Sequence, residues 1–326
     1  MNDKRKLVLV GTGFVGMSMA YSFLNTGGID ELVLIDVDKE KAIGEAMDLQ
    51  HGLPYARGKM SIKAGDYSEC KDASIVVVSA GVAQKDGETR LELTNRNAKI
   101  MKSVVEQIRD SGFGGILVIA SNPVDSMTYL AWKVSGYPKE RVIGSGTILD
   151  TARLRYLMSE YLNISSSNIH AYIMGEHGDS SFVPWTHAYV GAKSLLDLLD
   201  EKHKDLSDLH AIYTQVQQAA YEIIKRKRST YYGIGLSLNR LVHAILDDEN
   251  VILTVSAYQN GEYKQKGLYI GVPAMINAQG IKEIIPLALN EVDQAKFNHS
   301  CDTLREINEK KYGIDCLKSH LRMTFS

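Results

Sequence analysis

The stretch that decides the fold is LVLVGTGFVG, residues 7–16. Its first four residues form an apolar run typical of a fully buried strand, and the next six fit the pattern G-x-G-x-x-G. In that context Gly11 permits a tight turn, Gly13 lets the backbone approach a pyrophosphate, and Gly16 lets helix and strand pack closely. The stretch therefore predicts a dinucleotide-binding unit, with the pyrophosphate at the N-terminus of the following helix.

The end of the second predicted strand carries a carboxylate. Asp36 follows this strand, twenty residues after Gly16. A carboxylate there suits a ribose 2′-hydroxyl and repels a 2′-phosphate, so NAD is favoured over NADP as cofactor. The alternative is a simple glycine turn beside an ordinary surface aspartate.

The first half of the chain alternates short apolar runs with helical patterns. Strands are predicted at residues 7–10, 32–35, 74–79 and 116–120, and helices at residues 14–25, 39–51 and 93–110. Such alternation predicts an α/β fold with a doubly wound parallel sheet of the Rossmann type.

The pattern changes near residue 145. Helices are predicted at residues 147–162, 206–227 and 290–311, a strand at residues 169–174, and antiparallel strands at residues 251–258 and 268–272. We therefore expect a Rossmann NAD-binding domain over residues 1–145 and an α+β substrate-binding, catalytic domain over residues 146–326. The absence of a disordered linker predicts a broad interface between them.

Composition excludes several classes of function. The 326 residues allow two domains, and a net charge of −2 provides no basic field to recruit nucleic acid. The basic run KRKR, residues 225–228, is interpreted as a solvated helix end. No stretch approaches the roughly 18 apolar residues of a membrane span. The cysteines lack metal-ligand spacing, so we expect reduced thiols, no metal site and a cytoplasmic protein. They are Cys70, Cys301 and Cys316.

Two downstream segments carry candidate chemistry: DTAR, residues 150–153, and GEHGD, residues 175–179. His177 is a candidate acid/base, because imidazole titrates near neutrality. Asp150 can hold the imidazole tautomer, and Arg153, one helical turn later, can grip a carboxylate through two hydrogen bonds. Together these groups predict oxidation of a 2-hydroxy acid. The structural alternatives are an ordinary histidine, a helix-capping or surface aspartate and a surface salt bridge.

A polar segment, AGVAQKDGETR at residues 80–90, joins a predicted strand to a helix. Gly81 and Gly87 provide hinges, which suits a mobile lid over a site at the carboxyl edge of the sheet. Arg90 would then enter on closure and polarise the substrate carbonyl. The alternative is a flexible surface loop without a catalytic part.

Six motifs in the same order make the chain resemble the L-lactate dehydrogenase family, of the bacterial allosteric type, from residue 7 to about residue 313. The motifs are GTGFVG (11–16), AGVAQKDGETR (80–90), SNPVD (121–125), GSGTILDTAR (144–153), GEHGD (175–179) and STYYGI (229–234). The resemblance implies His177 as acid/base, Asp150 as its orienting partner, Arg153 as carboxylate clamp and Arg90 as carbonyl polariser. Further substrate contacts implied are Gln84, Asn122 and Thr230, and further cofactor contacts are Phe14, Val15, Asn122, Ser145 and Ile234.

The choice of substrate depends on Gln84. Malate-type members of the superfamily carry an arginine at this position, which pairs with a second carboxylate. A neutral Gln84 would leave that carboxylate desolvated and unpaired, so pyruvate and L-lactate are the predicted substrates. Dehydrogenation of malate or 2-hydroxyisocaproate stays open as an alternative. A non-enzymatic NAD-binding structural or sensor protein is a further alternative, although it would be expected to lack part of the catalytic set.

Arg155 and His170 match positions that bind fructose 1,6-bisphosphate in allosteric bacterial members. An arginine and a protonatable histidine suit a doubly charged phosphate. The resemblance thus implies activation by this sugar bisphosphate and a homotetramer, against the alternative of two ordinary surface residues. Residues 314–326 extend past the resemblance, and the sequence leaves their role open.

Overall fold

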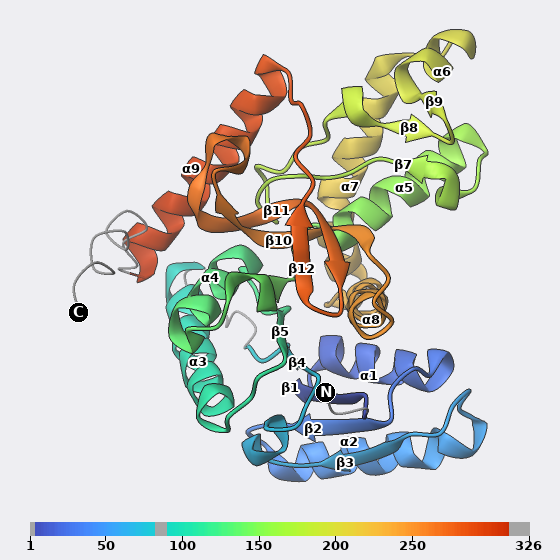
Figure 1. The fold of residues 1–326 in the computed structure, drawn as a ribbon. Helices are drawn as coiled ribbons and strands as arrows, with labels where there is room; N and C mark the ends of the chain where they lie inside the picture. The colour runs from blue at the N-terminus through green and yellow to red at the C-terminus, as the bar shows by residue number, and fades with distance from the viewer. Residues whose placement is uncertain (1–3, 82–89, 313–326) are drawn as a thin grey trace.

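The computed structural model describes residues 4–81 and 90–312 of the chain (Figure 1). The strands are β1 (Lys6–Val10), β2 (Glu31–Ile35), β3 (Ser61–Ala64), β4 (Ile75–Val78), β5 (Ile116–Ile119), β6 (Val142–Gly144), β7 (Ile169–His170), β8 (Tyr189–Val190), β9 (Lys193–Ser194), β10 (Val251–Asn260), β11 (Lys266–Asn277) and β12 (Gly280–Ile284). The helices are α1 (Phe14–Thr26), α2 (Lys39–Gly52), α3 (Arg90–Asp110), α4 (Val124–Ser135), α5 (Ile148–Leu162), α6 (Leu195–Glu201), α7 (Leu206–Lys227), α8 (Tyr232–Leu246) and α9 (Glu291–Tyr312).

One nine-stranded sheet runs through both halves of the chain, in the order β12-β11-β10-β6-β5-β4-β1-β2-β3. The segment from β3 to β6 is parallel and has the strand order of a Rossmann fold, which confirms the predicted fold class. The antiparallel strands of the second half join its edge where Ser256 of β10 pairs with Gly144 of β6. Hydrogen bonding of the sheet therefore continues past residue 145.

Alternation along β1 divides the core into two layers. Leu7 and Leu9 pack in a cluster with α1, α2 and α8, whereas Val8 and Val10 pack in a second cluster with α3 and α4. Figure 1 shows these helices on opposite sides of the parallel strands. Because both faces are covered, the strands are apolar throughout, and each such side chain contributes roughly 1.5–3 kcal/mol on burial.

The strand predicted at residues 169–174 is wrong in length. Only Ile169–His170 form β7, which pairs with β8 in the small sheet β7-β8-β9. Farther on, Met174 pairs singly with Phe182, and Gly175 pairs singly with Gly271 of β11. The segment therefore changes partners along its length, so a continuous ladder does not form. The strand predicted at residues 268–272 is also too short, since β11 covers Lys266–Asn277. The other predicted elements end within three residues of their observed ends.

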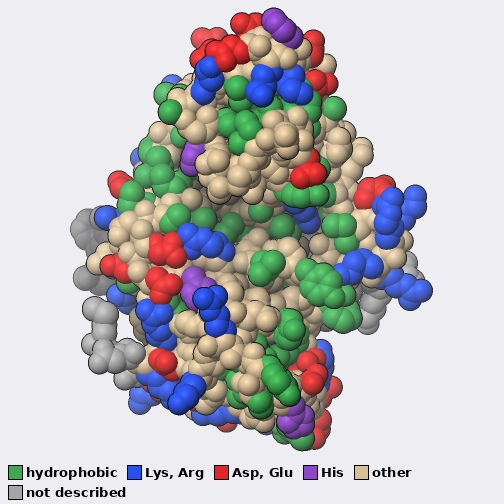
Figure 2. Space-filling model, turned by 90° about the vertical axis from the view of Figure 1, so that its right-hand side faces the viewer, with side chains coloured by type: hydrophobic (Ala, Val, Ile, Leu, Met, Phe, Trp, Pro, Cys, Tyr) green, Lys and Arg blue, Asp and Glu red, His purple; other side chains and the backbone are tan. Residues whose placement is uncertain are grey.

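The surface bears both signs of charge. Figure 2 shows positive and negative side chains interspersed over one face of the molecule. Among the described residues no helix is long and apolar enough to cross a membrane, and no group of three or more His, Cys, Asp or Glu side chains is placed to hold a metal ion. Cys70 and Cys301 are buried free thiols, and Cys316 lies outside the described residues.

The basic run at residues 225–228 ends α7, as predicted for a solvated helix end, and its four side chains are exposed. Arg228 has φ +68°, a left-handed conformation that favours glycine. We expect Arg228→Gly to increase the free energy of unfolding by about 1 kcal/mol, measured by urea denaturation. The control is Arg226→Gly inside the helix, which should lower stability by a similar amount. An unchanged or lower midpoint for Arg228→Gly would show that the arginine side chain compensates for its backbone.

Candidate active site

The predicted cofactor residues gather at one edge of the sheet. Gly11, Asp36 and Ser145 directly follow β1, β2 and β6, and Asn122 follows β5 by three residues. These strands are parallel, so their carboxyl ends meet at the same edge, where ligands bind in open α/β sheets. The amide of Gly11 donates to the carbonyl of Ile35 at 2.8 Å, which ties the first two loops together.

The three glycines of GTGFVG have different structural requirements. A Cβ on Gly11, at φ +101°, would lie 2.6 Å from the backbone nitrogen of Ala80, and a Cβ on Gly16 would lie 2.3 Å from the carbonyl oxygen of Gly11. A Cβ on Gly13 would meet no atom within 4 Å, so this residue borders open space. Gly13 also precedes α1, whose first-turn amides have no acceptor within the helix. This arrangement fits a pyrophosphate.

Asp36 is held against the glycine-rich loop. Its Oδ2 accepts hydrogen bonds from the backbone amide of Thr12 at 2.7 Å and from the Thr12 hydroxyl at 2.8 Å. Burial opposes the charge, but these hydrogen bonds outweigh it and hold the pKa of Asp36 below its ordinary value. Thr12 occupies a variable position of the motif, and no role was predicted for it. The available signal was a hydroxyl directly after the first glycine.

The loop also touches the second half of the chain. The exposed ring of Phe14 stacks on Tyr231, with the ring centroids 5.1 Å apart. Val15 and Ile234 pack against the same core cluster. The structure thus brings the STYYGI segment against the dinucleotide loop, which places Thr230, half-buried ahead of α8, in this region.

DTAR and GEHGD meet as predicted. Nδ1 of His177 lies 2.7 Å from Oδ2 of Asp150, and Oδ1 of Asp150 accepts from the Arg153 guanidinium at 3.1 Å. Burial opposes the charge on Asp150, yet His177 and Arg153 hold its pKa below the ordinary value. Burial also lowers the pKa of His177, but the charge and hydrogen bond of Asp150 outweigh it and raise that pKa above the ordinary value. The pair therefore favours an imidazolium with Nε2 available for proton transfer.

Buried hydroxyls fix the distance between these two segments. Thr147 donates to the carbonyl of Ile173 at 2.6 Å, and the amide of Ile173 donates to the hydroxyl of Thr151 at 2.9 Å. Beyond Ile173, Gly175 adopts φ +100° and bonds to Gly271, so the chain turns back toward α5. The hydroxyls of Thr147 and Thr151 therefore join the N-terminal end of α5 to the backbone of the segment that leads to His177.

Asp125 is a site residue to which the sequence assigned no role. Its Oδ2 accepts from the backbone amide of His177 at 2.8 Å, and its Oδ1 accepts from the hydroxyl of Ser256. The residue is 2% exposed, and burial raises its pKa to about 6. The available signal was a charged residue in the first turn of an otherwise apolar stretch of α4.

Family models match almost the whole chain. Residues 5–144 match the NAD-binding domain of lactate/malate dehydrogenase, and residues 147–313 match the alpha/beta C-terminal domain of the same family. The chain belongs to the lactate/malate dehydrogenase family. It is accordingly an NAD-dependent oxidoreductase.

Relatives of this dehydrogenase agree with that assignment. L-lactate dehydrogenase 2 of Bacillus cereus is 54% identical over 303 residues, which cover 92% of this chain and 96% of the relative. A lactate dehydrogenase from a Medee basin deep-sea metagenome library superimposes with a TM-score of 0.92 at 55% identity, covering 94% and 98% of the two chains. The ligand-bound minor L-lactate dehydrogenase of Enterococcus mundtii gives a TM-score of 0.93 at 46% identity, covering 95% and 99%.

The structure describes only some of the remaining predicted substrate residues. Asn122 is exposed at the end of β5, and its carbonyl accepts from the Asn97 amide at 3.3 Å. Arg90 begins α3, but its side chain lies outside the described part of the dehydrogenase, as does all of Gln84. The geometry of the predicted lid is therefore not part of the observed site.

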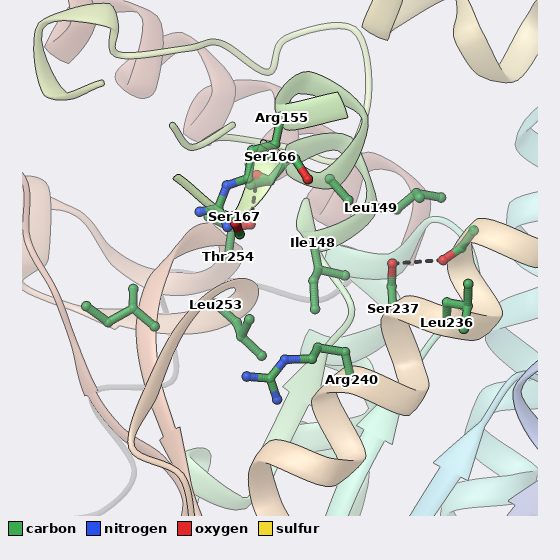
Figure 3. Close-up of a pocket in the computed structure, with 14 residues that line it drawn as sticks. Ile148, Leu149, Arg155, Ser166, Ser167, Leu236, Ser237, Arg240, Leu253 and Thr254 are labelled. Atoms are coloured by element: carbon green, nitrogen blue, oxygen red, sulfur yellow. Dashed lines mark hydrogen bonds between the residues drawn. The ribbon is translucent and has the colours of Figure 1, made fainter. Parts of the chain in front are cut away.

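Arg155 lines a cavity of about 510 Å³ between α5, α8 and β10. Figure 3 shows its side chain beside Ser166 and Ser167, while Arg240 lies at the other end of the cavity. The Nε of Arg155 donates to the carbonyl of Ala171 at 3.1 Å, directly after the exposed His170. No direct contact joins the two predicted effector residues among the described residues, and His170 is not among those that line the cavity.

Proposed function

We propose that this enzyme is an L-lactate dehydrogenase, which interconverts pyruvate and L-lactate with NADH and NAD⁺. The observation that carries the proposal is the His177–Asp150–Arg153 cluster, with its 2.7 and 3.1 Å contacts, in a chain with a dinucleotide loop. L-lactate dehydrogenases at 54% identity over most of both chains support the same substrate.

We assign each residue of the cluster one task. Arg153 binds the substrate carboxylate, for which a guanidinium offers paired donors. Arg90 polarises the carbonyl of pyruvate when the loop closes and excludes water. Bound NADH supplies the hydride to C2. His177 gives its Nε2 proton to the carbonyl oxygen, and Asp150 stabilises the imidazolium before that transfer. In the reverse direction neutral His177 takes the hydroxyl proton of L-lactate.

The cofactor residues follow from the same proposal. Gly11, Gly13 and Gly16 shape the loop for the pyrophosphate, with Phe14 and Val15 beside it. Asp36 accepts from the ribose hydroxyls of NAD, and it would exchange the Thr12 contacts for them. Asn122, Ser145, Thr230 and Ile234 are proposed to line the nicotinamide and substrate end. The chain would then divide near residue 145 into cofactor-binding and substrate-binding domains, and its cytoplasmic location stays a prediction.

The function is tested with a panel of 2-oxo acids and NADH. We expect the highest kcat/KM for pyruvate, with oxaloacetate and branched 2-oxo acids well below it. A higher kcat/KM for oxaloacetate would identify a malate dehydrogenase instead. Preference for 2-oxoisocaproate would identify an enzyme for bulkier hydroxy acids.

Substrate choice is predicted to depend on Gln84. We expect Gln84→Arg to shift the ratio of kcat/KM for oxaloacetate over pyruvate by at least about 100-fold, because the new cation pairs with the second carboxylate and no longer suits a methyl group. Steady-state rates with both acids measure the shift. Lys85→Arg is the neighbouring control, for which the ratio should stay near the wild-type value. An unchanged ratio in Gln84→Arg would show that residue 84 does not face the substrate.

We also propose that fructose 1,6-bisphosphate activates a homotetramer of this enzyme through Arg155 and His170. The support is chemical: a guanidinium in a cavity with two serine hydroxyls, next to an exposed histidine, suits a phosphate. We expect the effector to lower the pyruvate concentration at half-maximal rate and Arg155→Gln to lose this response. Identical pyruvate dependence with and without saturating effector would refute the activation, and the native mass tests the tetramer.

A further inference from the structure

A second carboxylate contacts His177 through its backbone. Asp125, in the first turn of α4, accepts from the His177 amide at 2.8 Å. We propose that Asp125 is a positioning residue for the reaction, which holds the backbone of His177 in place and whose negative charge favours the protonated imidazole. The inference rests on the proposed role of His177 as acid/base.

The carboxylate joins three separate elements. Besides the His177 amide, Asp125 accepts from the hydroxyl of Ser256 in β10, and both residues are almost fully buried. Thus α4, the GEHGD loop and β10 meet at one side chain. Burial of a carboxylate is costly unless its oxygens are hydrogen-bonded and its charge is compensated. The opposite charge that acts on Asp125 is that of His177, whereas Glu176 adds a repulsion.

The charges around His177 come from three directions. Asp150 and Arg153 belong to α5, Asp125 belongs to α4, and Glu176 precedes His177 in its own loop. Burial lowers the pKa of His177; Asp150 raises it most, Asp125 raises it further, and Arg153 opposes both. Asp150 acts directly on Nδ1, so it orients the ring. Asp125 acts without touching the ring, and its contribution is therefore separable by mutation.

Asp125→Asn removes the charge with little change in shape. The amide oxygen can still accept from the His177 backbone, and the amide nitrogen can donate to Ser256. Without the charge, the pKa of His177 should fall. Pyruvate reduction needs the protonated ring, so the alkaline limb of its pH profile moves to lower pH. At pH values above that limb we expect kcat/KM for pyruvate to fall about tenfold. Lactate oxidation needs the neutral ring, so its acid limb moves in the same direction, and its kcat/KM above the limb falls by the same factor because the equilibrium constant of the reaction is unchanged.

The experiment measures kcat/KM against pH from about 5 to 9, in both directions, for wild type, Asp125→Asn and Ser126→Ala. Below about pH 6 Asp125 itself protonates, so the two profiles should converge there. Ser126 is the matched control, because it is buried on the same turn of α4 and its hydroxyl has no hydrogen-bond partner among the described residues. A purely structural role for Asp125 would lower the melting temperature and leave both limbs in place.

The outcomes separate this inference from the proposed function. The role of Asp125 is supported if both pH limbs shift to lower pH in Asp125→Asn while the limbs of Ser126→Ala stay at the wild-type pH. Unshifted limbs in a folded, active Asp125→Asn overturn it, whereas a wild type that does not turn over pyruvate overturns the proposed function. If Asp125→Asn does not fold, Ser256→Ala decides: loss of its hydroxyl raises the pKa of Asp125, so a smaller shift in the same direction is required.

Discussion

His177→Asn should fold and bind NADH yet lose most of its turnover. Asparagine cannot donate or accept a proton near neutrality, so the carbonyl oxygen must take its proton from water. General acid–base catalysis of this kind contributes roughly 10²–10⁴-fold, and we expect kcat with pyruvate to fall by about 10³-fold or more. Stopped-flow single turnovers measure the loss on the chemical step itself.

The variant keeps most of the surrounding contacts. The backbone amide of His177 still donates to Asp125, and asparagine can still donate to Asp150. Fluorescence titration should therefore give an NADH affinity within about twofold of wild type, because the dinucleotide loop is untouched. His187→Asn, a histidine near the same segment but outside the cluster, serves as control and should retain turnover. Near-normal kcat in His177→Asn would refute the assignment of the acid/base.

Asp150→Asn should have the second-largest effect, and it should depend on pH. The Asp150 carboxylate raises the pKa of His177, so its loss lowers that pKa and depletes the imidazolium. Because pyruvate reduction starts from the imidazolium, we expect its kcat/KM near neutral pH to fall by roughly 10²–10⁴-fold. Lactate oxidation should lose the same factor at each pH, because the equilibrium constant of the reaction is unchanged, and its acid limb should move to lower pH.

The matched control is Asp302→Asn. Asp302 pairs with Arg305 three residues later on α9, with the same spacing as Asp150 and Arg153, but it is exposed and has no contact with the cluster among the described interactions. Exposed pairs contribute little, so activity and pH profile should match wild type. Limbs that stay at the wild-type pH in Asp150→Asn would mean that the carboxylate acts only by orienting the ring. In that case its charge would not set the protonation of His177.

The sequence predicted four of the six parallel strands, β1, β2, β4 and β5, because the information there is local, whereas β3 and β6 were not predicted. A strand buried on both faces must be apolar throughout, and G-x-G-x-x-G is a steric requirement that can be checked residue by residue. At Gly11 and Gly16 an added Cβ would overlap backbone atoms of neighbouring segments. The Asp150–Arg153 pair was equally predictable, because three residues of helix place both side chains on one face.

The predicted length of the strand at residues 169–174 was wrong because strand length depends on pairing with distant parts of the chain. Its apolar composition is correct for a buried segment, but the partners of Met174 and Gly175 come from two different places. Composition reports that a segment is buried and extended. Composition does not show which backbone segments will pair with that segment, so it could not predict the length of the strand.

By itself the sequence determined the Rossmann fold class, the preference for NAD and the placement of Asp150 and Arg153 on one helix face, because each depends on short-range spacing and residue chemistry. Only the tertiary structure decided that the second half extends the same sheet and that Asp125 and Ser256 meet behind His177. These contacts join residues more than 50 and 130 positions apart. A buried carboxylate can be interpreted only when its partners are known, since burial and charge compensation are properties of the assembled fold.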